Sequence, residues 1–210
     1  MWIERTVIHR CENPVFAGYQ RRLREAYFAH DMQTGPWVQP FIDEIAGLAR
    51  APFPFDTTIS LSHAQRLANN EVAARREGIL VSCVSEPGKV EEVPYRLYPG
   101  VRVIGRRTHR RTDGITNGMV YTVLECSGSG AVLEETILRF GATERKKEWA
   151  SMSVLERDTT LAAAMTVAGC QGKTLGRTRV QGLRSPHMTA ENLIVCTNRT
   201  RRLADSRCDP

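Results

Sequence analysis

The stretch AAMTVAGCQGKTLGR, residues 163–177, decides how this chain is interpreted, because it joins an apolar run to a glycine-containing loop. It contains Gly172-Lys173-Thr174, the end of the phosphate-binding pattern G-x-x-x-x-G-K-[ST]. Five residues before Gly172, however, stands Val167 rather than glycine. A β-branched residue resists the positive φ angles that such a cradle commonly needs. Half of the motif is present, so its surroundings must decide its role.

The composition is that of a soluble globular protein with one large domain or two small ones. The chain has 210 residues, of which 41% are hydrophobic and 25% charged. It holds no apolar run of about 18 residues and no apolar core of a secretory signal, so we expect an intracellular protein, cytoplasmic or nuclear, with no membrane contact. Its six cysteines lie far apart, which favours reduced buried thiols and no metal site.

Positive charge is concentrated in two stretches. Residues 96–113 carry six arginines and one acidic residue, and residues 173–202 carry seven lysines and arginines and one acidic residue. Such concentration favours a polyanionic partner. The alternative for each stretch is a solvated surface of a basic protein.

Local patterns predict helices first and an α/β unit next. Residues 1–54 read as mostly helical, with a break at TGPW (34–37). TTISLSH (57–63) predicts a strand, and Ser62 with Gln65 forms a capping box for the following helix. That helix is expected to bury the face made by Ala64, Leu67, Ala68, Val72 and Ile79. ILVSCVS (79–85) predicts a second strand.

From about residue 86 to 150 the pattern changes to short β segments separated by turns. The segments are VRVIG, MVYTVLEC and AVLEETILRF, and the turns are TDGITNG and SGSG. This predicts a small antiparallel barrel inserted between two α/β pieces. Afterwards we expect strands at 160–167, 177–183 and 191–196, with Thr197-Asn198 capping a helix that opens RTRRLAD.

Four segments in order resemble the C-terminal half of a superfamily 1 DNA helicase, on the RecD-like and Pif-like side. They are TTISLSHAQRLANNEVA, PGVRVIGRRTHRRTDGITNGMVYTV, AAMTVAGCQGKTL and ENLIVCTNRTRRL. The resemblance covers roughly residues 55–203. It implies an α/β fold with a second RecA-like domain at 55–85 and 151–210, lacking its own Walker A loop. It also implies an SH3-like barrel inserted at 86–150 and a helical linker region at 1–54.

The resemblance assigns the opening stretch to the fifth helicase motif rather than to a Walker loop. It implies that Thr166, Lys173 and Thr174 contact single-stranded DNA, whose phosphates small residues and hydroxyls at a strand end can approach. Gln171 and Gly172 would face the ATP cleft. Arg66, in the region of the fourth motif, is a further nucleotide-binding candidate. The alternative is a glycine-rich turn that only packs.

Further residues match the closing motif and the barrel. By the resemblance Arg199 is the arginine that reaches the γ-phosphate and stabilises the charge of phosphoryl transfer. The alternative is one surface arginine among several. Asn117 matches the Asn-Gly turn of the barrel, and the loop before it would contact DNA phosphates without sequence preference or stay solvated. Its arginines are Arg106, Arg107, Arg110 and Arg111.

The chain also departs from the helicase pattern. Where the fifth motif usually has a His-Lys pair, this chain has Ala168-Gly169. The closing motif reads Cys-Thr-Asn-Arg rather than Ala-Leu-Thr-Arg. We find neither Walker motif, and expect the first RecA-like domain to be supplied in cis by a longer protein or in trans. ATP and Mg²⁺ would bind the complete helicase, whereas this chain alone is expected to bind DNA weakly and not to hydrolyse ATP. The alternatives are a non-catalytic nucleic-acid-binding module and a degenerate P-loop kinase or NTPase using Lys173.

Overall fold

The computed structural model describes residues 13–49, 55–85, 91–106, 115–139, 142–171, 173, 175–199 and 206–209. The chain divides into two compact units, and each is described by itself. The first contains Met1–Arg66 and Met165–Pro210, and the second contains Leu67–Ala164. The second unit is therefore wider than the insertion expected at 86–150, because it also includes most of one helix and a strand from each flank.

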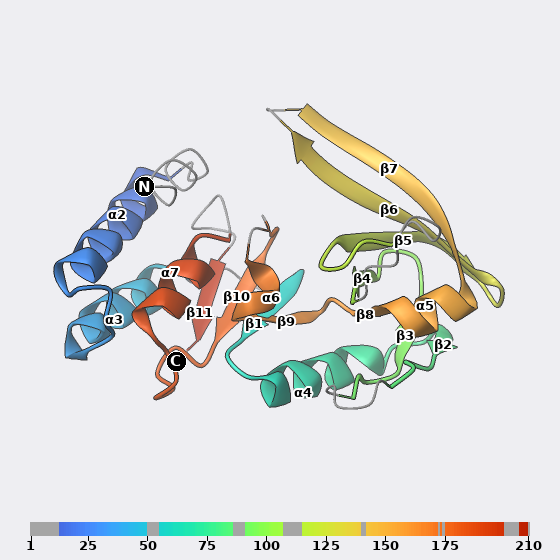
Figure 1. The fold of residues 1–210 in the computed structure, drawn as a ribbon, viewed down its shortest axis with the longest axis horizontal. Helices are drawn as coiled ribbons and strands as arrows, with labels where there is room; N and C mark the ends of the chain where they lie inside the picture. Colours follow the sequence, from blue (N-terminus) through green and yellow to red (C-terminus); the bar gives the residue numbers. More distant parts are fainter. Residues whose placement is uncertain are drawn as a thin grey trace. The chain divides into compact units, whose positions relative to one another are not determined.

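The first unit is built on a four-stranded sheet with the order β11-β10-β1-β9 (Figure 1). Its strands are β1 (Thr57–Ser60), β9 (Ala164–Thr166), β10 (Thr178–Gln181) and β11 (Ser206–Asp209). Strand β10 pairs in parallel with both β1 and β11. Parallel strands are normally covered on both faces, and Ile59, Val180 and Cys208 are buried here. The α/β class expected from the sequence is confirmed.

Helices pack beside this sheet, and the helical prediction for the N-terminal region is confirmed for its described part. They are α2 (Pro14–Ala29), the 3₁₀ turn η2 (Pro36–Val38), α3 (Gln39–Leu48), α6 (Val167–Cys170) and α7 (Ala190–Thr197). Helix α2 begins because the Asn13 side chain accepts a hydrogen bond from the Phe16 amide. It buries Phe16, Tyr19 and Leu23, packs against α7, and α3 packs against β11.

The strand predicted at 191–196 is wrong, because this segment is helix α7. Thr189 caps the helix by accepting a hydrogen bond from the Asn192 amide at 3.1 Å. Ala190, Leu193 and Cys196 are then buried at steps of three residues, which a helix places on one face. Consequently Thr197 ends a helix instead of opening one. Residues 200–205 of the predicted helix lie outside the described residues, and the last strand is β11.

Helix α4 (His63–Ala74) was predicted correctly, but its buried face was not. The capping contacts are present: the Gln65 amide donates to the Ser62 hydroxyl at 3.2 Å. The buried side chains are Arg66 and Asn70, whereas Ala64, Ala68 and Val72 are exposed. Asn70 donates from Nδ2 to the Leu161 carbonyl at 3.1 Å and accepts the Ala164 amide at 2.7 Å. The Asn70 side chain therefore supplies hydrogen-bond partners to buried backbone groups between β8 and β9, and this fixes which face of α4 is buried.

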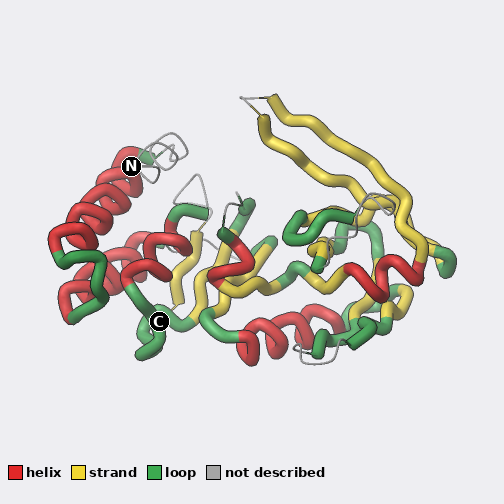
Figure 2. Tube along the Cα trace, in the orientation of Figure 1, coloured by secondary structure: helices red, strands yellow, loops and turns green. Residues whose placement is uncertain are grey.

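The second unit is dominated by a five-stranded antiparallel sheet with the order β7-β6-β5-β4-β8 (Figure 2). Its strands are β4 (Arg102–Gly105), β5 (Val120–Ser127), β6 (Gly130–Arg139), β7 (Ala142–Ser151) and β8 (Thr159–Leu161). Helix α5 (Met152–Asp158) connects β7 to β8, and β2 (Ile79–Val81) pairs separately with β3 (Tyr95–Leu97). Among the described strands this sheet has two edges, so the closed barrel expected at 86–150 is not observed.

Two local features hold the second unit together. The predicted Asn-Gly turn is present: Gly118 adopts φ 76°, and its amide donates to the Gly105 carbonyl at 2.7 Å. Buried tyrosines find polar partners, since the Tyr95 hydroxyl lies 2.6 Å from that of Thr159 and the Tyr121 hydroxyl accepts the Thr116 amide.

The run predicted as one strand at 160–167 is interrupted at residues 162–163, between β8 and β9.

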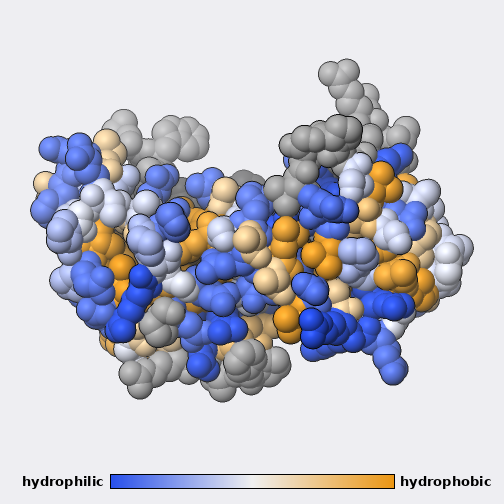
Figure 3. Space-filling model, turned by 90° about the horizontal axis from the view of Figure 1, so that it is seen from below, coloured by the Kyte–Doolittle hydropathy of each residue, from blue (hydrophilic) through white to orange (hydrophobic). Residues whose placement is uncertain are grey.

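On the face drawn in Figure 3, apolar residues occur in small patches separated by polar ones. No helix in the described part of the chain is long and apolar enough to cross a membrane.

Candidate functional site

The stretch that begins the sequence analysis forms the end of strand β9, the short helix α6 and the loop before β10. The Thr166 hydroxyl oxygen accepts the Gly169 amide at 3.1 Å and so caps α6. Val167 and Cys170 are buried under the turn, whereas Gln171 is exposed. The loop therefore has Val167 and Cys170 anchored beneath it and Gln171 at the surface.

Arg199 lies at the end of α7 and is hydrogen-bonded to this loop. Its Nη1 donates to the carbonyls of Cys170 at 3.3 Å and Lys173 at 3.1 Å, and its Nε donates to the Val195 carbonyl. The Leu175 amide in turn donates to the Arg199 carbonyl at 2.8 Å. The structure thus brings the predicted arginine together with the predicted fifth motif. In this conformation its guanidinium binds backbone oxygens.

Lys173 adds a second cation to the same loop. Its ammonium group donates a hydrogen bond to the Gly169 carbonyl. Partial burial lowers the pKa of Lys173 below its ordinary value, and the nearby Arg199 lowers it further. Among the described residues no carboxylate contributes to this shift. Two cations beside exposed loop polar groups make a site suited to an anion.

The thiols of this region are buried and neutral. Burial raises the pKa of Cys170 to about 11 and that of Cys196 well above its ordinary value. Cys83, Cys126 and Cys208 are also free. No group of histidine, cysteine or acidic residues within the described ranges could hold a metal ion. Cys11 lies outside the described residues.

Asn198, immediately before Arg199, was identified from the sequence only as a helix cap. Its side-chain oxygen Oδ1 is buried and finds no hydrogen-bond donor in the described part of the chain. Leaving a buried acceptor unsatisfied costs about 1–3 kcal/mol. The signal in the sequence was an asparagine where the helicase motif has serine or threonine.

Of the other predicted site residues, some are buried, some are hydrogen-bonded within the chain or exposed in a turn, and some lie outside the described residues. Arg66 is only 7% exposed, in the first turn of α4. Arg106 is half-buried and hydrogen-bonded to backbone carbonyls. It donates from Nε to the Arg157 carbonyl at 3.1 Å and from Nη2 to the Glu156 carbonyl at 3.2 Å and to a third carbonyl, that of Val84.

Arg106 therefore binds carbonyls at the C-terminal end of α5, where a cation also meets the negative end of the helix dipole. Asn117 is exposed in its turn. Five predicted residues lie outside the described residues: Arg107, Arg110, Arg111, Gly172 and Thr174.

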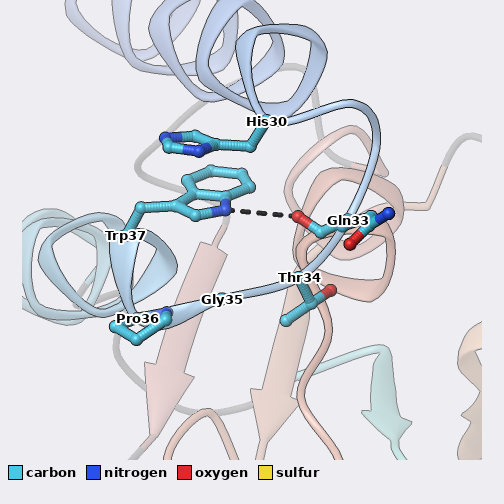
Figure 4. Close-up of a pocket in the computed structure, with 6 residues that line it drawn as sticks. All are labelled: His30, Gln33, Thr34, Gly35, Pro36 and Trp37. Carbon is cyan, nitrogen blue, oxygen red and sulfur yellow. Dashed lines mark hydrogen bonds between the residues drawn. The ribbon is translucent and has the colours of Figure 1, made fainter.

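A separate pocket of about 390 Å³ is lined by His30, Gln33, Thr34, Gly35, Pro36 and Trp37 (Figure 4). The rings of His30 and Trp37 stack with centroids 4.9 Å apart, and Trp37 donates from Nε1 to the Gln33 carbonyl. None of the residues singled out from the sequence lines this pocket. It is a feature of the connection between α2 and α3.

The fold is similar to that of Pif1 helicases of known structure. For a Bacteroides Pif1 helicase in complex with ADP-AlF3 and single-stranded DNA, the TM-score is 0.59 at 16% identity, over 96% of this chain and 50% of that chain. For the Candida albicans Pif1 helicase, the TM-score is 0.59 at 12% identity, over 93% of this chain and 53% of that one. This chain thus spans about half the length of these proteins. The similarity to the C-terminal half of such helicases that the sequence suggested is confirmed at the level of the mixed α/β fold, but the inserted SH3-like barrel is not.

Comparisons of the sequence add nothing to this result. No protein-family model matches the chain, and no curated protein matches it.

Proposed function

We propose that this chain is the C-terminal portion of an ATP-dependent DNA helicase of superfamily 1. The observation that carries the proposal is the direct hydrogen bonding of Arg199 to the loop of residues 170–173, in a chain with the fold of half a Pif1 helicase. In the complete helicase these two motifs would form one side of the nucleotide cleft. Residues 55–85 and 151–210 would be the second RecA-like domain, residues 86–150 the counterpart of the SH3-like insertion, and residues 1–54 a linker region.

This side of the cleft would contribute to ATP hydrolysis by electrostatic stabilisation. When nucleotide is bound, the Arg199 guanidinium would exchange its carbonyl partners for a phosphate oxygen and stabilise charge in phosphoryl transfer. Gln171, Gly172 and Arg66 would contact the nucleotide. The described residues supply cations but no cluster of carboxylates for Mg²⁺. The lysine and magnesium ligands would therefore come from the first RecA-like domain, in cis or in trans.

Single-stranded DNA is the proposed partner of the same loop. The Thr166 hydroxyl uses its oxygen to cap α6, and its hydrogen would be donated to a phosphate oxygen. Lys173 and Thr174 would contact the backbone beside it, as would Asn117 and the basic loop of residues 107–111. Alone, such contacts give weak, salt-sensitive and sequence-blind binding.

A non-catalytic nucleic-acid-binding module is the second candidate. It is favoured by Ala168-Gly169 in place of the usual His-Lys pair, and by the engagement of Arg199 with backbone carbonyls. In this case the fold and its basic surface would be retained without a nucleotide cleft.

Binding of labelled single-stranded DNA by the full chain tests the shared part of both candidates. We expect Thr166→Val, which is nearly isosteric but has no hydroxyl, to weaken binding about 10-fold or more, since a hydrogen bond to a charged group contributes about 1.5–3 kcal/mol. Thr189→Val, in the cap of α7, is the matched control, because its hydroxyl also caps a helix. Equal affinities for all three proteins would remove the fifth motif from the DNA-binding surface.

A further inference from the structure

Helix α7 ends next to Arg199, so the contacts that hold this helix end decide where the arginine lies. Carbonyls in the last turn of a helix have no partner within the helix. In α7 two of them are bound by Arg199 itself: its Nε donates to the Val195 carbonyl at 2.9 Å and its amide to the Cys196 carbonyl at 3.3 Å. The carbonyl of Thr197, the last residue of the helix, is bound by a different element.

The donor to the Thr197 carbonyl is Gln20, in the middle of helix α2. Its Nε2 lies 2.8 Å from the carbonyl oxygen, although the two residues are 177 positions apart in the chain. Gln20 is 4% exposed and Thr197 is 3% exposed, so loss of the bond would leave a carbonyl buried without this donor. Helix α2 packs against α7 (Figure 1). The end of α7 is thus fixed to α2 two residues before Arg199.

Arg199 carries this constraint into the loop of the fifth motif. Its Nη1 donates to the carbonyls of Cys170 and Lys173, and its own carbonyl accepts the Leu175 amide at 2.8 Å. A displacement of the helix end would therefore move both the guanidinium and the loop. Displacing a group that acts in a reaction by about 1 Å can reduce the rate about 100-fold.

We propose that Gln20 is a positioning residue for Arg199. Through the Thr197 carbonyl it fixes the end of α7, and with it the guanidinium that stabilises charge in phosphoryl transfer. The inference rests on the proposed function for the role of Arg199. Helix α2 thereby supports the ATP site without contributing a group to it. Because α2 lies in the proposed linker region of residues 1–54, a shift of this helix would reach Arg199 through the Gln20 side chain.

A purely structural role for Gln20 can be distinguished with its neighbour on α2. Tyr19 is also buried, and its hydroxyl donates to the Phe41 carbonyl at 3.1 Å, which joins α2 to α3. Both side chains therefore link α2 to a backbone carbonyl of another helix. If Gln20 only stabilised the packing of α2, the loss of either bond should have the same consequences. Tyr19→Phe is the matched control, because it removes one such donor and leaves the contact with α7 in place.

The first measurement is amide hydrogen exchange in the full chain, followed by nuclear magnetic resonance. Gln20→Met keeps the length of the side chain but has no donor, so we expect the Leu175 amide to exchange about 5-fold faster. Tyr19→Phe should leave this rate unchanged. Thr34→Val is a second control, because the Thr34 hydroxyl accepts the Ala190 amide at the opposite end of α7. It should also leave the exchange of Leu175 unchanged.

The second measurement is ATP hydrolysis by the full chain after addition of the first RecA-like domain of a Pif1 helicase. We expect Gln20→Met to lower kcat about 10-fold and to leave KM for ATP within about 2-fold, because a displaced arginine loses contacts made in the transition state. Tyr19→Phe should retain the native kcat. Gln20→Asn, whose amide is one methylene group shorter, should resemble Gln20→Met and replaces it if that variant does not fold.

The outcomes separate the inference from the proposed function. Unchanged exchange of the Leu175 amide in Gln20→Met would overturn the inference, and so would an equal increase in either control. Turnover that is lost in Arg199→Ala but native in Gln20→Met would overturn the inference and leave the proposed function intact. Absence of turnover by the native chain with the added domain would overturn the proposed function, and with it the role of Gln20 in the reaction.

Discussion

Removing the Asn70 side chain should destabilise the second unit more than any comparably conservative change on helix α4. Asn70 is 1% exposed, donates to the Leu161 carbonyl at 3.1 Å and accepts the Ala164 amide at 2.7 Å. In Asn70→Ala both backbone groups stay buried without partners. Each such group costs about 1–3 kcal/mol, so we expect a loss of about 2–6 kcal/mol in the free energy of unfolding.

Urea unfolding followed by circular dichroism measures this loss, and the midpoint of the transition should fall without a change in slope. With two compact units the curve has to be tested for two transitions, and only that of the second should move. Val72→Ala is the control on the same helix, since Val72 is 66% exposed. It should change stability by less than about 0.5 kcal/mol. A similarly small effect of Asn70→Ala would refute the role given to this amide.

Three further expectations concern charge, a helix end and the thiols. Burial alone would raise the pKa of Asp209, but hydrogen bonds and charges from two arginines outweigh it and hold the pKa below its ordinary 3.8. The stability that Asp209 contributes is therefore present above about pH 4 and is lost as the pH falls further. In Asp209→Asn, the free energy of unfolding should decrease less steeply with falling pH in this range. Arg106→Ala should cost about 2 kcal/mol in thermal unfolding, and Arg106→Lys should not restore it, because one ammonium cannot replace the fork that reaches three carbonyls. At pH 8, Cys170 and Cys196 should react with a thiol reagent far more slowly in the folded chain than in urea; equal rates would contradict their burial.

Elements with a clear local signal were predictable from the sequence. Strand β1 and the start of α4 follow from the alternation of Ile59 and Leu61 and from the Ser62–Gln65 cap. The turn at Gly118 follows from the need for a positive φ. In each case the information lies within a few residues of the chain.

Features that depend on distant partners were not predictable. Residues 191–196 are apolar enough for a strand, and only the Thr189 cap and the packing of α7 on α2 make them helical. The buried face of α4 was assigned by hydrophobicity, whereas Asn70 decides it through backbone groups more than 90 residues away. The carbonyl partners of Arg106 could not be foreseen, because charge alone does not show that an arginine binds the carbonyls of α5.

For the candidate site, the sequence located the right segments but not their relation. That Arg199 and the loop of residues 170–173 belong together followed from the helicase resemblance, and the structure shows the hydrogen bonds that join them. That Oδ1 of Asn198 is buried without a donor among the described residues could not be foreseen, because it depends on how distant segments pack around it.

The central claim is that this chain supplies one side of a helicase ATP site. The most direct test is ATP hydrolysis by the full chain with single-stranded DNA, alone and after addition of the first RecA-like domain of a Pif1 helicase, with Arg199→Ala as the comparison. The account predicts no turnover by the chain alone and DNA-stimulated turnover with the added domain, reduced at least 100-fold in Arg199→Ala because an arginine finger contributes about 10³–10⁵ to the rate. DNA-stimulated turnover by the chain alone, or turnover indifferent to Arg199, would contradict it.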